Sequence, residues 1–380
     1  MEHEDLLRHR LDALLRDITS RHPLRQAVMA VETEDRSFRW IGGAGDSDVG
    51  SGTVTAESPF FIASIDKMLN AAVILKLSET GLIDLDNTLA SYLPVGIVRD
   101  LHHAGRRDRT GEVTLRHLLS HTSGLADWLE DRPKRGRSLI ERVIEGGDIA
   151  IGIEQIAEIV RGLRPHFSPQ DLRLPRPRMR YSDTNYMLLI AVIEAVTEKP
   201  VHTVHEQLLY QPLGLDHTYF PGVTRPTKPV CRPLTLCAMG QPLEIPDFLQ
   251  SIRAIYSTTS DMIAFMRSLV RGDLFDGPDT LNSMKSRWNR FGIPRDQAAL
   301  RAPSWPIEYG LGLMRYRLPR IFNRLKPMPP VIGHTGSTGC WLFHCPSRDL
   351  FLTGGVDEVT AGAIPYRWVP RILRAIAVER

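Results

Sequence analysis

The pattern of apolar and polar positions along the chain separates strand-like segments at its two ends from a largely helical middle. Apolar residues recur at helical spacing over 4–20, and two segments that alternate or run apolar, 25–34 and 37–43, then predict a β-hairpin. A wide apolar face predicts a buried helix over 64–80, which Gly81 ends. Further helices are predicted over 113–124, 138–145, 153–163, 185–197, 204–210, 260–271 and 368–378, and strands over 309–318, 331–337, 339–345 and 350–356.

This order of elements predicts two lobes around one sheet. Strands at both ends of a chain that enclose a helical insertion are typical of a sheet built from N- and C-terminal segments. We expect residues 1–85 and 240–380 to form a discontinuous α/β lobe, and residues 86–239 to form a mostly helical lobe. A cleft between two lobes is the default place for a small-molecule substrate.

Composition narrows the classes of partner. The 380 residues carry 47 Lys and Arg against 44 Asp and Glu, a net charge of +3, which is too balanced to indicate nucleic-acid binding. Arginines gather over 161–180, but prolines interrupt them and favour a solvated loop. The first ten residues are charged and lack the apolar core of a secretory signal, and no apolar run reaches membrane-spanning length. We therefore expect a cytoplasmic protein without a nucleic-acid or membrane partner.

Cysteines and histidines give no sign of a metal site. The four cysteines are too few and too scattered for a disulfide scaffold, so we expect reduced thiols. His117 and His121 have the i,i+4 spacing of helical zinc ligands, but the residues between them lack the glutamate of H-E-x-x-H. We interpret both histidines as core or capping residues.

Candidate chemistry starts at the N-terminal end of the helix predicted over 64–80. Ser64 and Lys67 are three residues apart, which places a hydroxyl and an amine on one side of the helix and within reach of each other. A serine needs an adjacent base to act as a nucleophile, and a lysine can serve if desolvation lowers its pKa. The alternative for such a pair is a capping serine with a solvated lysine.

Two further stretches hold the chemistry that this pair lacks. Tyr181 lies in a loop before a predicted helix, and near a lysine its phenolate could exchange a proton with a serine oxygen or a leaving group. In the stretch 333–339, Gly333 and Gly336 allow another backbone or a ligand to approach closely. The backbone N–H of Ser337 could there pair with that of Ser64 to hold an oxyanion.

Taken together, these motifs resemble a known superfamily. Ser64-x-x-Lys67, Tyr181-Ser-Asp183 and His334-Thr-Gly336 occur in the order and approximate spacing of the serine β-lactamase and penicillin-binding-protein-like superfamily. The resemblance is closest to its class C β-lactamase, D-alanyl-D-alanine carboxypeptidase and family VIII carboxylesterase branch. Segments similar to those of this branch occur at 114–125, 212–215, 257–261 and 309–313.

The resemblance implies a fold and a set of roles. The implied fold is α/β (α+β) and β-lactamase/transpeptidase-like, with an antiparallel sheet flanked by helices plus an all-helical lobe. Ser64 would be the acylated nucleophile, and Lys67 and Tyr181 would share general base and acid duty. His334 would stand where many members have a lysine, and the amides of Ser64 and Ser337 would form the oxyanion hole. No metal or organic cofactor is expected.

Two positions depart from the family's common pattern. Asp183 replaces the asparagine of Tyr-x-Asn; ionised near Lys67, it should raise the pKa of the lysine and make Tyr181 the more plausible base. Asn185 is a candidate for the missing amide. His334 makes a positive charge for a substrate carboxylate conditional on pH. Both changes disfavour a dedicated β-lactamase.

The sequence therefore predicts a serine hydrolase that cleaves small carboxylic esters, or amides, through an acyl-Ser64 intermediate. Trp128 and Trp341 are candidates for the pocket wall, and Cys340 is expected to be a buried thiol beside the site. An acyltransferase with the same acyl-enzyme, a D-amino-acid peptidase or amidase and a weak β-lactamase stay open as alternatives. A catalytically silent scaffold is disfavoured because Ser64, Lys67 and Tyr181 are all present. The oligomeric state stays open.

Overall fold

The computed structural model describes residues 2–45, 53–104, 107–293, 296, 298, 300, 302–304, 306–318 and 328–377. The helices of these residues are α1 (Glu2–Thr19), α2 (Asp66–Glu79), α3 (Val95–Val98), α4 (Leu115–Leu119), α5 (Leu139–Ile144), α6 (Ile153–Gly162), α7 (Asp183–Thr197), α8 (Val201–His205), α9 (Gln211–Leu213), α10 (Pro246–Ser251), α11 (Thr259–Arg271), α12 (Pro278–Lys285) and α14 (Ile364–Ala377). The strands are β1 (Gln26–Thr33), β2 (Arg39–Gly45), β3 (Phe60–Phe61), β4 (His103–Ala104), β5 (Arg107–Asp108), β6 (Cys237–Ala238), β7 (Gln241–Pro242), β8 (Tyr256–Ser257), β9 (Asn289–Arg290), β10 (Ile307–Tyr309), β11 (Met314–Tyr316), β12 (Val331–Thr335), β13 (Trp341–Cys345) and β14 (Leu350–Val356).

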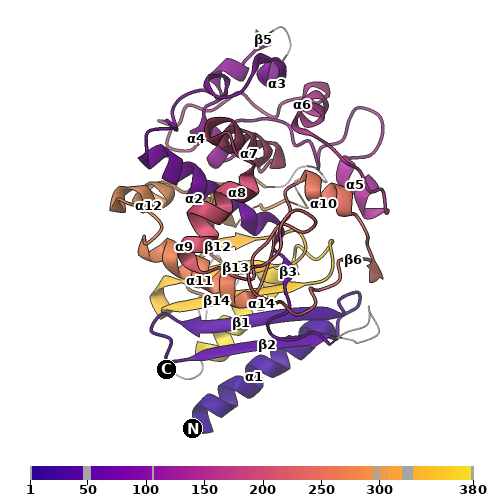
Figure 1. Cartoon of the computed structure of the whole chain (residues 1–380), viewed down its shortest axis with the longest axis vertical. Coiled ribbons are helices and arrows are strands. Elements are labelled where there is room, and N and C mark those ends of the chain that lie inside the picture. Colours follow the sequence, from indigo (N-terminus) through magenta and orange to yellow (C-terminus); the bar gives the residue numbers. More distant parts are fainter. Residues whose placement is uncertain are drawn as a thin grey trace.

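One antiparallel sheet joins the two ends of the chain. Its strand order is β2-β1-β14-β13-β12-β11-β10-β9, and β1 pairs with β14 so that Ala27 lies opposite Val356. The sheet occupies the lower half of Figure 1 and the helices from the middle of the chain the upper half. The predicted fold class, an antiparallel sheet flanked by helices, is therefore confirmed. The boundaries of the two lobes at residues 86 and 239 stay a prediction.

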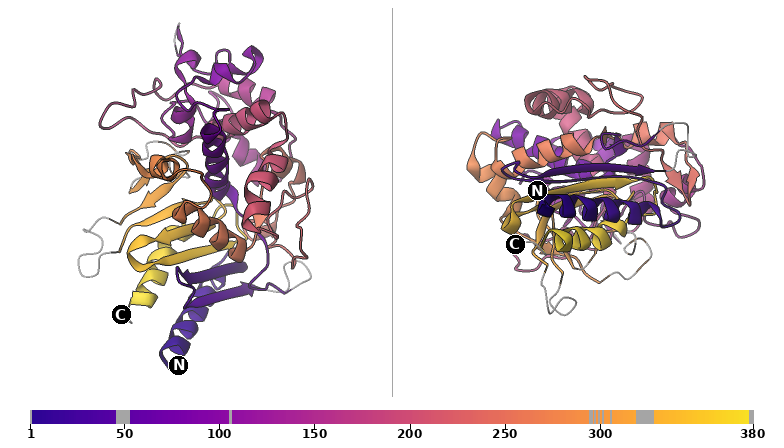
Figure 2. Two further views of the ribbon diagram at one scale, coloured as in Figure 1. Left: turned by 60° about the vertical axis from the view of Figure 1, so that its left-hand side comes forward. Right: turned by 90° about the horizontal axis from the view of Figure 1, so that it is seen from below.

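Helices cover both faces of the sheet because its strands are apolar on both sides. On β1, Met29 and Val31 join a cluster with side chains of α1 and α14, whereas Val28 and Ala30 join a cluster with α2 and α11. The right-hand view of Figure 2 shows α1 and α14 side by side beneath the sheet. The second cluster, called the large core below, continues through α2 into α4, α6 and α7.

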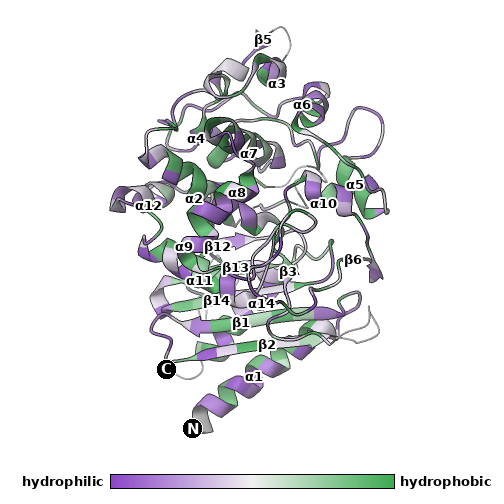
Figure 3. Cartoon of the chain, in the orientation of Figure 1, coloured by the Kyte–Doolittle hydropathy of each residue, from purple (hydrophilic) through white to green (hydrophobic). Residues whose placement is uncertain are grey.

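The central helix of the large core is α2. Ten of its residues are buried, and Figure 3 shows it as mostly apolar along its length, whereas α1 alternates between apolar and polar residues. A helix that is apolar around most of its circumference must be surrounded by protein. Because α2 lies between the sheet and α7, the residues at its N-terminal end face the junction of the two lobes.

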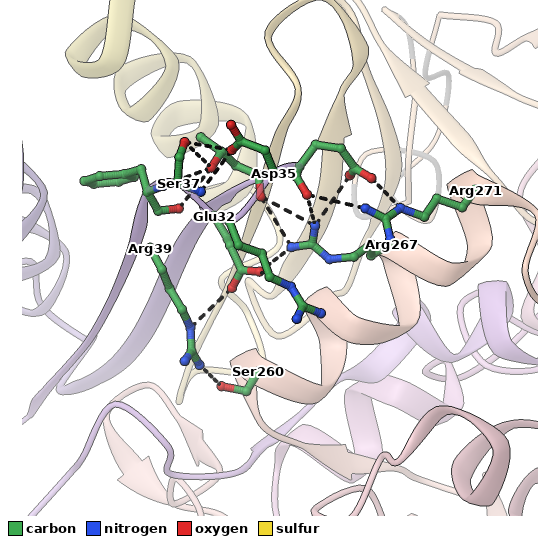
Figure 4. Close-up of polar contacts among 11 residues, drawn as sticks. Glu32, Asp35, Ser37, Arg39, Ser260, Arg267 and Arg271 are labelled. Atoms are coloured by element: carbon green, nitrogen blue, oxygen red, sulfur yellow. Dashed lines mark hydrogen bonds and ion pairs between the residues drawn. The ribbon is translucent and has the colours of Figure 1, made fainter.

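A buried ion-pair network fastens α11 to the N-terminal hairpin (Figure 4). Arg267 is 4% exposed; it pairs with Glu32 of β1 and donates a 2.7 Å hydrogen bond from Nη1 to the carbonyl of Glu34. Arg39 of β2 lies 3.2 Å from the other oxygen of Glu32 and donates a 2.8 Å hydrogen bond to Ser260 Oγ. This network is a feature that the sequence pattern does not reveal.

Most predicted helices and strands are present; the differences concern their ends, one predicted strand that is divided in two, and several short elements that were not predicted. The helix predicted over 113–124 ends at Leu119, because the backbone at His121 (φ +55°) and Gly124 (φ +75°) is left-handed. The strand predicted over 309–318 is two strands, β10 and β11, which a turn at Gly310–Gly312 separates. The short helices α10 and α12 were not predicted; each begins at a proline, which suits the first turn of a helix.

Candidate active site

Ser64 lies in a 3-10 turn, Ala63–Ile65, that leads directly into α2. Ala63 has a φ of +44°, a conformation that is costly for a residue with a Cβ atom, so the backbone is strained immediately before the serine. One turn further on, Lys67 Nζ donates a 3.0 Å hydrogen bond to Ser64 Oγ. The structure thus places the predicted nucleophile and amine in direct contact.

Tyr181 reaches the same point from the extended stretch immediately before α7. The segment that follows α4 holds this stretch: the carbonyl of His121 accepts a hydrogen bond from Arg180 N, and His121 Nδ1 accepts one from Ser182 N. The ring of His121 also packs on that of Tyr181, with 4.3 Å between the ring centres. Lys67 Nζ lies 5.2 Å from the centre of the Tyr181 ring. The serine turn and the stretch of Tyr181, which are distant in sequence, therefore meet at one amine.

Asp183, in the first turn of α7, contacts the same amine. Its Oδ1 atom lies 2.7 Å from Lys67 Nζ, and Asp66 Oδ1 lies 4.0 Å from it. Burial by itself lowers the pKa of Lys67, but the charge of Asp183, with Tyr181 and Asp66, outweighs it and holds the pKa well above its ordinary value. This is the direction expected from the sequence, and it keeps Lys67 an ammonium at neutral pH.

Tyr181 and Asp66 also hold their protons more strongly than usual, because the pKa of each is raised. Burial raises the pKa of Tyr181 well above its ordinary value, although the charge of Lys67 acts to lower it. The Tyr181 hydroxyl is buried and has no hydrogen-bond partner of ordinary geometry among the described residues. Burial raises the pKa of Asp66 to about 6, and Lys67 reduces this shift. The phenol and the ammonium are therefore both protonated in the resting site.

The turn between β12 and β13 packs directly against the serine turn. A Cβ atom on Gly336 would stand 2.8 Å from the Cβ of Ala63 and 2.4 Å from Cys340 Sγ, so only glycine fits here. Ser337, the next residue, is exposed at the cavity. Cys340 is buried behind the turn, where its thiol donates to the carbonyl of Ile62, and burial raises its pKa to about 12. The thiol is thus protonated, as expected for a packing residue.

His334 lies behind the site rather than at the cavity surface. Its ring is fully buried and is not among the side chains that line the cavity. Nδ1 is 2.7 Å from the carbonyl of Thr335, and Nε2 is 3.0 Å from Tyr309 Oη. Burial, with the charge of Lys67, lowers the pKa of His334 to about 3. The ring is therefore neutral across the physiological range, and the pH-dependent charge expected from the sequence is not present there.

Of the remaining predicted site residues, Trp128 lines the cavity and two others do not. Asn185 is fully buried, and its amide is engaged by Ser123 Oγ at 2.7 Å and His121 Nδ1 at 2.9 Å. Trp341 is fully buried in the cluster that contains α1 and α14. The structure thus does not bring Asn185 or Trp341 to the reaction space.

Ser64, Lys67, Tyr181 and Asp183 border a cavity of about 610 Å³. This volume falls within the roughly 300–1,000 Å³ that small-molecule sites occupy. Gly336 and Ser337 line it from the sheet side, and Trp128 from the helical side. The cavity can therefore hold a small organic molecule with one of its carbonyl groups beside Ser64.

Sequence reasoning missed several polar groups around Lys67. Tyr186 Oη donates to the carbonyl of Leu119 and accepts a 3.3 Å hydrogen bond from Tyr309 Oη, and Lys67 Nζ lies 5.5 Å from the Tyr186 ring. Asp66 gave no signal in the sequence, because an acidic residue is common in the first turn of a helix. Nothing in the sequence indicates that Tyr186 and Tyr309 meet.

The described residues show no sign of a metal centre: no group of three or more His, Cys, Asp or Glu side chains among them is placed to hold an ion. His117 caps α4, since its Nδ1 accepts a hydrogen bond from Thr114 N, and His121 is a buried core residue. The interpretation of both histidines from the sequence is confirmed. None of the described helices combines the length and apolar character needed to cross a membrane. All four cysteines are free thiols.

Known proteins share this fold and much of this sequence pattern. The unguisins hydrolase ungD of Aspergillus violaceofuscus is 27% identical over 195 residues, which make up 50% of this chain and 31% of that protein. The chain thus spans about a third of the length of this curated relative. A D-stereospecific amidohydrolase from Streptomyces sp. is 25% identical, with a TM-score of 0.69 over 98% of both chains. EstCE1, described as a hydrolase with promiscuous acyltransferase activity, has a TM-score of 0.72 and 20% identity over 98% of this chain and 99% of its own.

The family itself is identified over most of the length. Residues 11–354 match the Beta-lactamase family, a range that extends from α1 through the serine turn and α7 to β14. The arrangement of sheet and helices agrees with that match, and so does the meeting of Ser64, Lys67 and Tyr181. This chain belongs to the Beta-lactamase family, the group of serine-hydrolase-fold proteins that its motifs resemble.

Proposed function

We propose that this protein is a serine hydrolase that cleaves small carboxylic esters through an acyl-Ser64 intermediate. The observation that carries the proposal is the 3.0 Å hydrogen bond between Lys67 Nζ and Ser64 Oγ, at a cavity that also contains Tyr181. A hydroxyl, an amine and a phenol in mutual reach are what nucleophilic catalysis with proton transfer requires.

The raised pKa values decide which protonation state reacts. Because Lys67 and Tyr181 both hold their protons at neutral pH, the reactive form is the minor one in which this pair has lost one proton. In that form the deprotonated partner accepts the Ser64 proton while Oγ attacks the ester carbonyl. The bond to the leaving oxygen then breaks as that oxygen receives the proton. Water then gives a proton to the pair and attacks the acyl carbonyl. The bond between that carbon and Oγ breaks as Oγ takes the proton back from the pair, which releases the carboxylic acid and restores Ser64.

The negative charge that develops on the carbonyl oxygen needs donors. In this proposal the backbone N–H groups of Ser64 and Ser337 supply them, since Gly336 brings the β12–β13 turn against Ala63. One donor of this kind typically contributes about a hundred- to a thousandfold in rate. When Tyr181 is the deprotonated partner, the ammonium of Lys67 adds positive charge beside the attacking oxygen.

An ester fits this site better than a substrate with a carboxylate. His334 is neutral and buried, and the ammonium of Lys67 is already paired with Asp183. Neither of these groups therefore offers a free positive charge to a β-lactam or a peptide C-terminus. A neutral ester needs no such partner.

The direct test replaces the nucleophile. Ser64→Ala should abolish hydrolysis of 4-nitrophenyl acetate and butyrate while leaving the circular dichroism spectrum unchanged. Intact mass spectrometry after treatment with a fluorophosphonate should show one adduct on the native protein, located on Ser64, and none on the variant. An unchanged hydrolysis rate in the variant would refute Ser64 as the nucleophile.

Acyl transfer to an alcohol is a second candidate. A cavity of about 610 Å³ leaves room for an acceptor beside the acyl group, and EstCE1, which shares this fold, is described as having such activity. Product analysis with and without an added alcohol distinguishes the two activities: transfer yields a new ester of the added alcohol, whereas hydrolysis releases the acyl group only as the acid.

A further inference from the structure

The cavity continues from Ser64 into an apolar chamber between α5, α7 and α10, whose positions are shown in Figure 1. The apolar side chains that define this chamber come from the three helices: Ile140, Val143 and Ile144 from α5, Met187 and Ile190 from α7, and Phe248 and Leu249 from α10. Phe61 lines the cavity next to the serine turn. Apolar surface therefore extends from the nucleophile into the chamber.

Several of these side chains are only partly buried in the free protein. Phe61, Ile140, Ile144 and Leu249 all keep contact with solvent while lining the cavity. Ile140 and Ile144 stand four residues apart and so present one face of α5 to the chamber, whereas Arg142 between them is exposed and does not line it. When a ligand covers apolar surface of this kind, the free energy falls and binding is favoured.

Of the four charged side chains among the described residues that line the cavity, three lie at its Ser64 end, and the fourth is Glu130. Lys67 and Asp183 are paired beside Ser64, with Asp66 next to them. None of the described chamber residues on α5, α7 and α10 carries a charge. A ligand group that enters the chamber therefore binds most favourably if it is apolar and uncharged.

We propose that the substrate is an ester with a medium-length aliphatic or aryl group, and that this group occupies the apolar chamber while the carbonyl lies at Ser64. The inference rests on the proposed function, because the chamber opens onto the proposed nucleophile. The inference can nevertheless fail independently of the proposed function, because a serine esterase that places no part of its substrate in the chamber would not discriminate between esters by chain length.

Two series of substrates test it. For 4-nitrophenyl esters from acetate to decanoate, and for alkyl acetates of matched length, kcat/KM should rise about three- to fourfold per methylene in at least one series, until the chamber is filled. Flat or falling values in both series, with acetate hydrolysis still dependent on Ser64, would overturn the inference and leave the proposed function standing. Loss of all Ser64-dependent hydrolysis would overturn both.

Variants of α5 connect the preference to the chamber. Ile140→Trp and Ile144→Trp, which add bulk at two points of the wall, should each reduce the ratio of kcat/KM between the eight-carbon and two-carbon members of the series that shows the preference at least tenfold. Arg142→Trp on the outer face of the same helix should keep the native ratio. Equal ratios in all three folded variants would place the apolar group elsewhere and contradict the proposal; thermal unfolding shows which variants are folded.

Discussion

At the scale of single residues, the charge state of Lys67 controls the candidate site. Asp183 lies 2.7 Å from its amine and raises the pKa of the lysine well above its ordinary value. The same carboxylate also acts to raise the pKa of Tyr181. Asp183 therefore makes both proton carriers harder to deprotonate, which moves the reactive form of the site to higher pH.

Replacing that carboxylate should move the pH dependence. In Asp183→Asn the pKa values of Lys67 and Tyr181 both fall, so the ascending limb of kcat/KM against pH should shift toward acid. The measurement is a pH–rate profile for 4-nitrophenyl acetate, corrected for spontaneous hydrolysis. A limb that stays in place or moves toward alkali would show that neither group is the base.

The residues that were predictable from the sequence are those that depend on local spacing. Ser64 and Lys67 lie one helical turn apart, so their contact follows from the helix alone. His334 and Trp341 lie on neighbouring strands, where the direction of a side chain depends on the register and on what covers each face. Their burial away from the cavity could not be derived without the assembled sheet.

At the scale of elements, the β12–β13 turn and the serine turn act as one unit. The Cβ of Ala63 would stand only 2.8 Å from a Cβ at position 336, so the two turns are in close contact. Since the proposed oxyanion donors come one from each turn, any separation of the turns weakens the pair.

Gly336→Ala should therefore reduce kcat for ester hydrolysis about a hundredfold, the typical effect of losing one oxyanion donor. Gly96→Ala is the matched control, because a Cβ atom there meets nothing within 4 Å. Steady-state kinetics on both variants provide the comparison. Native kcat in Gly336→Ala would mean that the turn does not hold the oxyanion.

The ion pairs between α11 and β1 support the sheet rather than the chemistry. Arg267→Leu leaves the buried carboxylate of Glu32 with two exposed partners, Arg36 and Arg39, and should lower the free energy of unfolding by about 3 kcal/mol. Arg271→Leu, on the same helix, removes a half-exposed partner of Glu34 and should cost less than about 1 kcal/mol. Urea unfolding measures both, and equal losses would contradict this ranking.

Elements with a long periodic pattern were predictable, whereas strand order was not. The helices α1, α2, α6, α7 and α11 all agree with their predicted ranges within about two residues. The pairing of β1 with β14 joins residues more than 300 positions apart, and local periodicity contains no information about such a partner. Only the general tendency of terminal strands to share a sheet pointed to it.

At the scale of the whole molecule, one hydrophobic core connects the sheet with the helical lobe. The large core extends from Val28 of β1 through Met68 of α2 to Leu188 of α7. Buried polar contacts follow the same path: His205 of α8 lies 3.0 Å from Asn70 Oδ1 of α2 and is fully buried.

His205 should make the fold sensitive to acid. Burial lowers its pKa to about 3 in the folded state, whereas an unfolded histidine titrates near 6.5. Between these values the unfolded chain binds a proton that the folded chain does not, so stability present above about pH 6.5 is lost as the pH falls toward 3. His205→Gln should flatten this dependence in thermal unfolding curves recorded from pH 7 to 4. A variant with the native slope would contradict it.

The shared core also determines how this protein can respond to its ligands. Among the described residues, apolar packing continues from the sheet through α2 into α7, so the sheet and these helices are joined by one core behind the cavity. The shape of the cavity beside Ser64 is then set by the packed side chains before a ligand binds. Under the proposed function, a change of ester preference therefore requires substitution of individual residues of the cavity wall rather than a change in a domain motion.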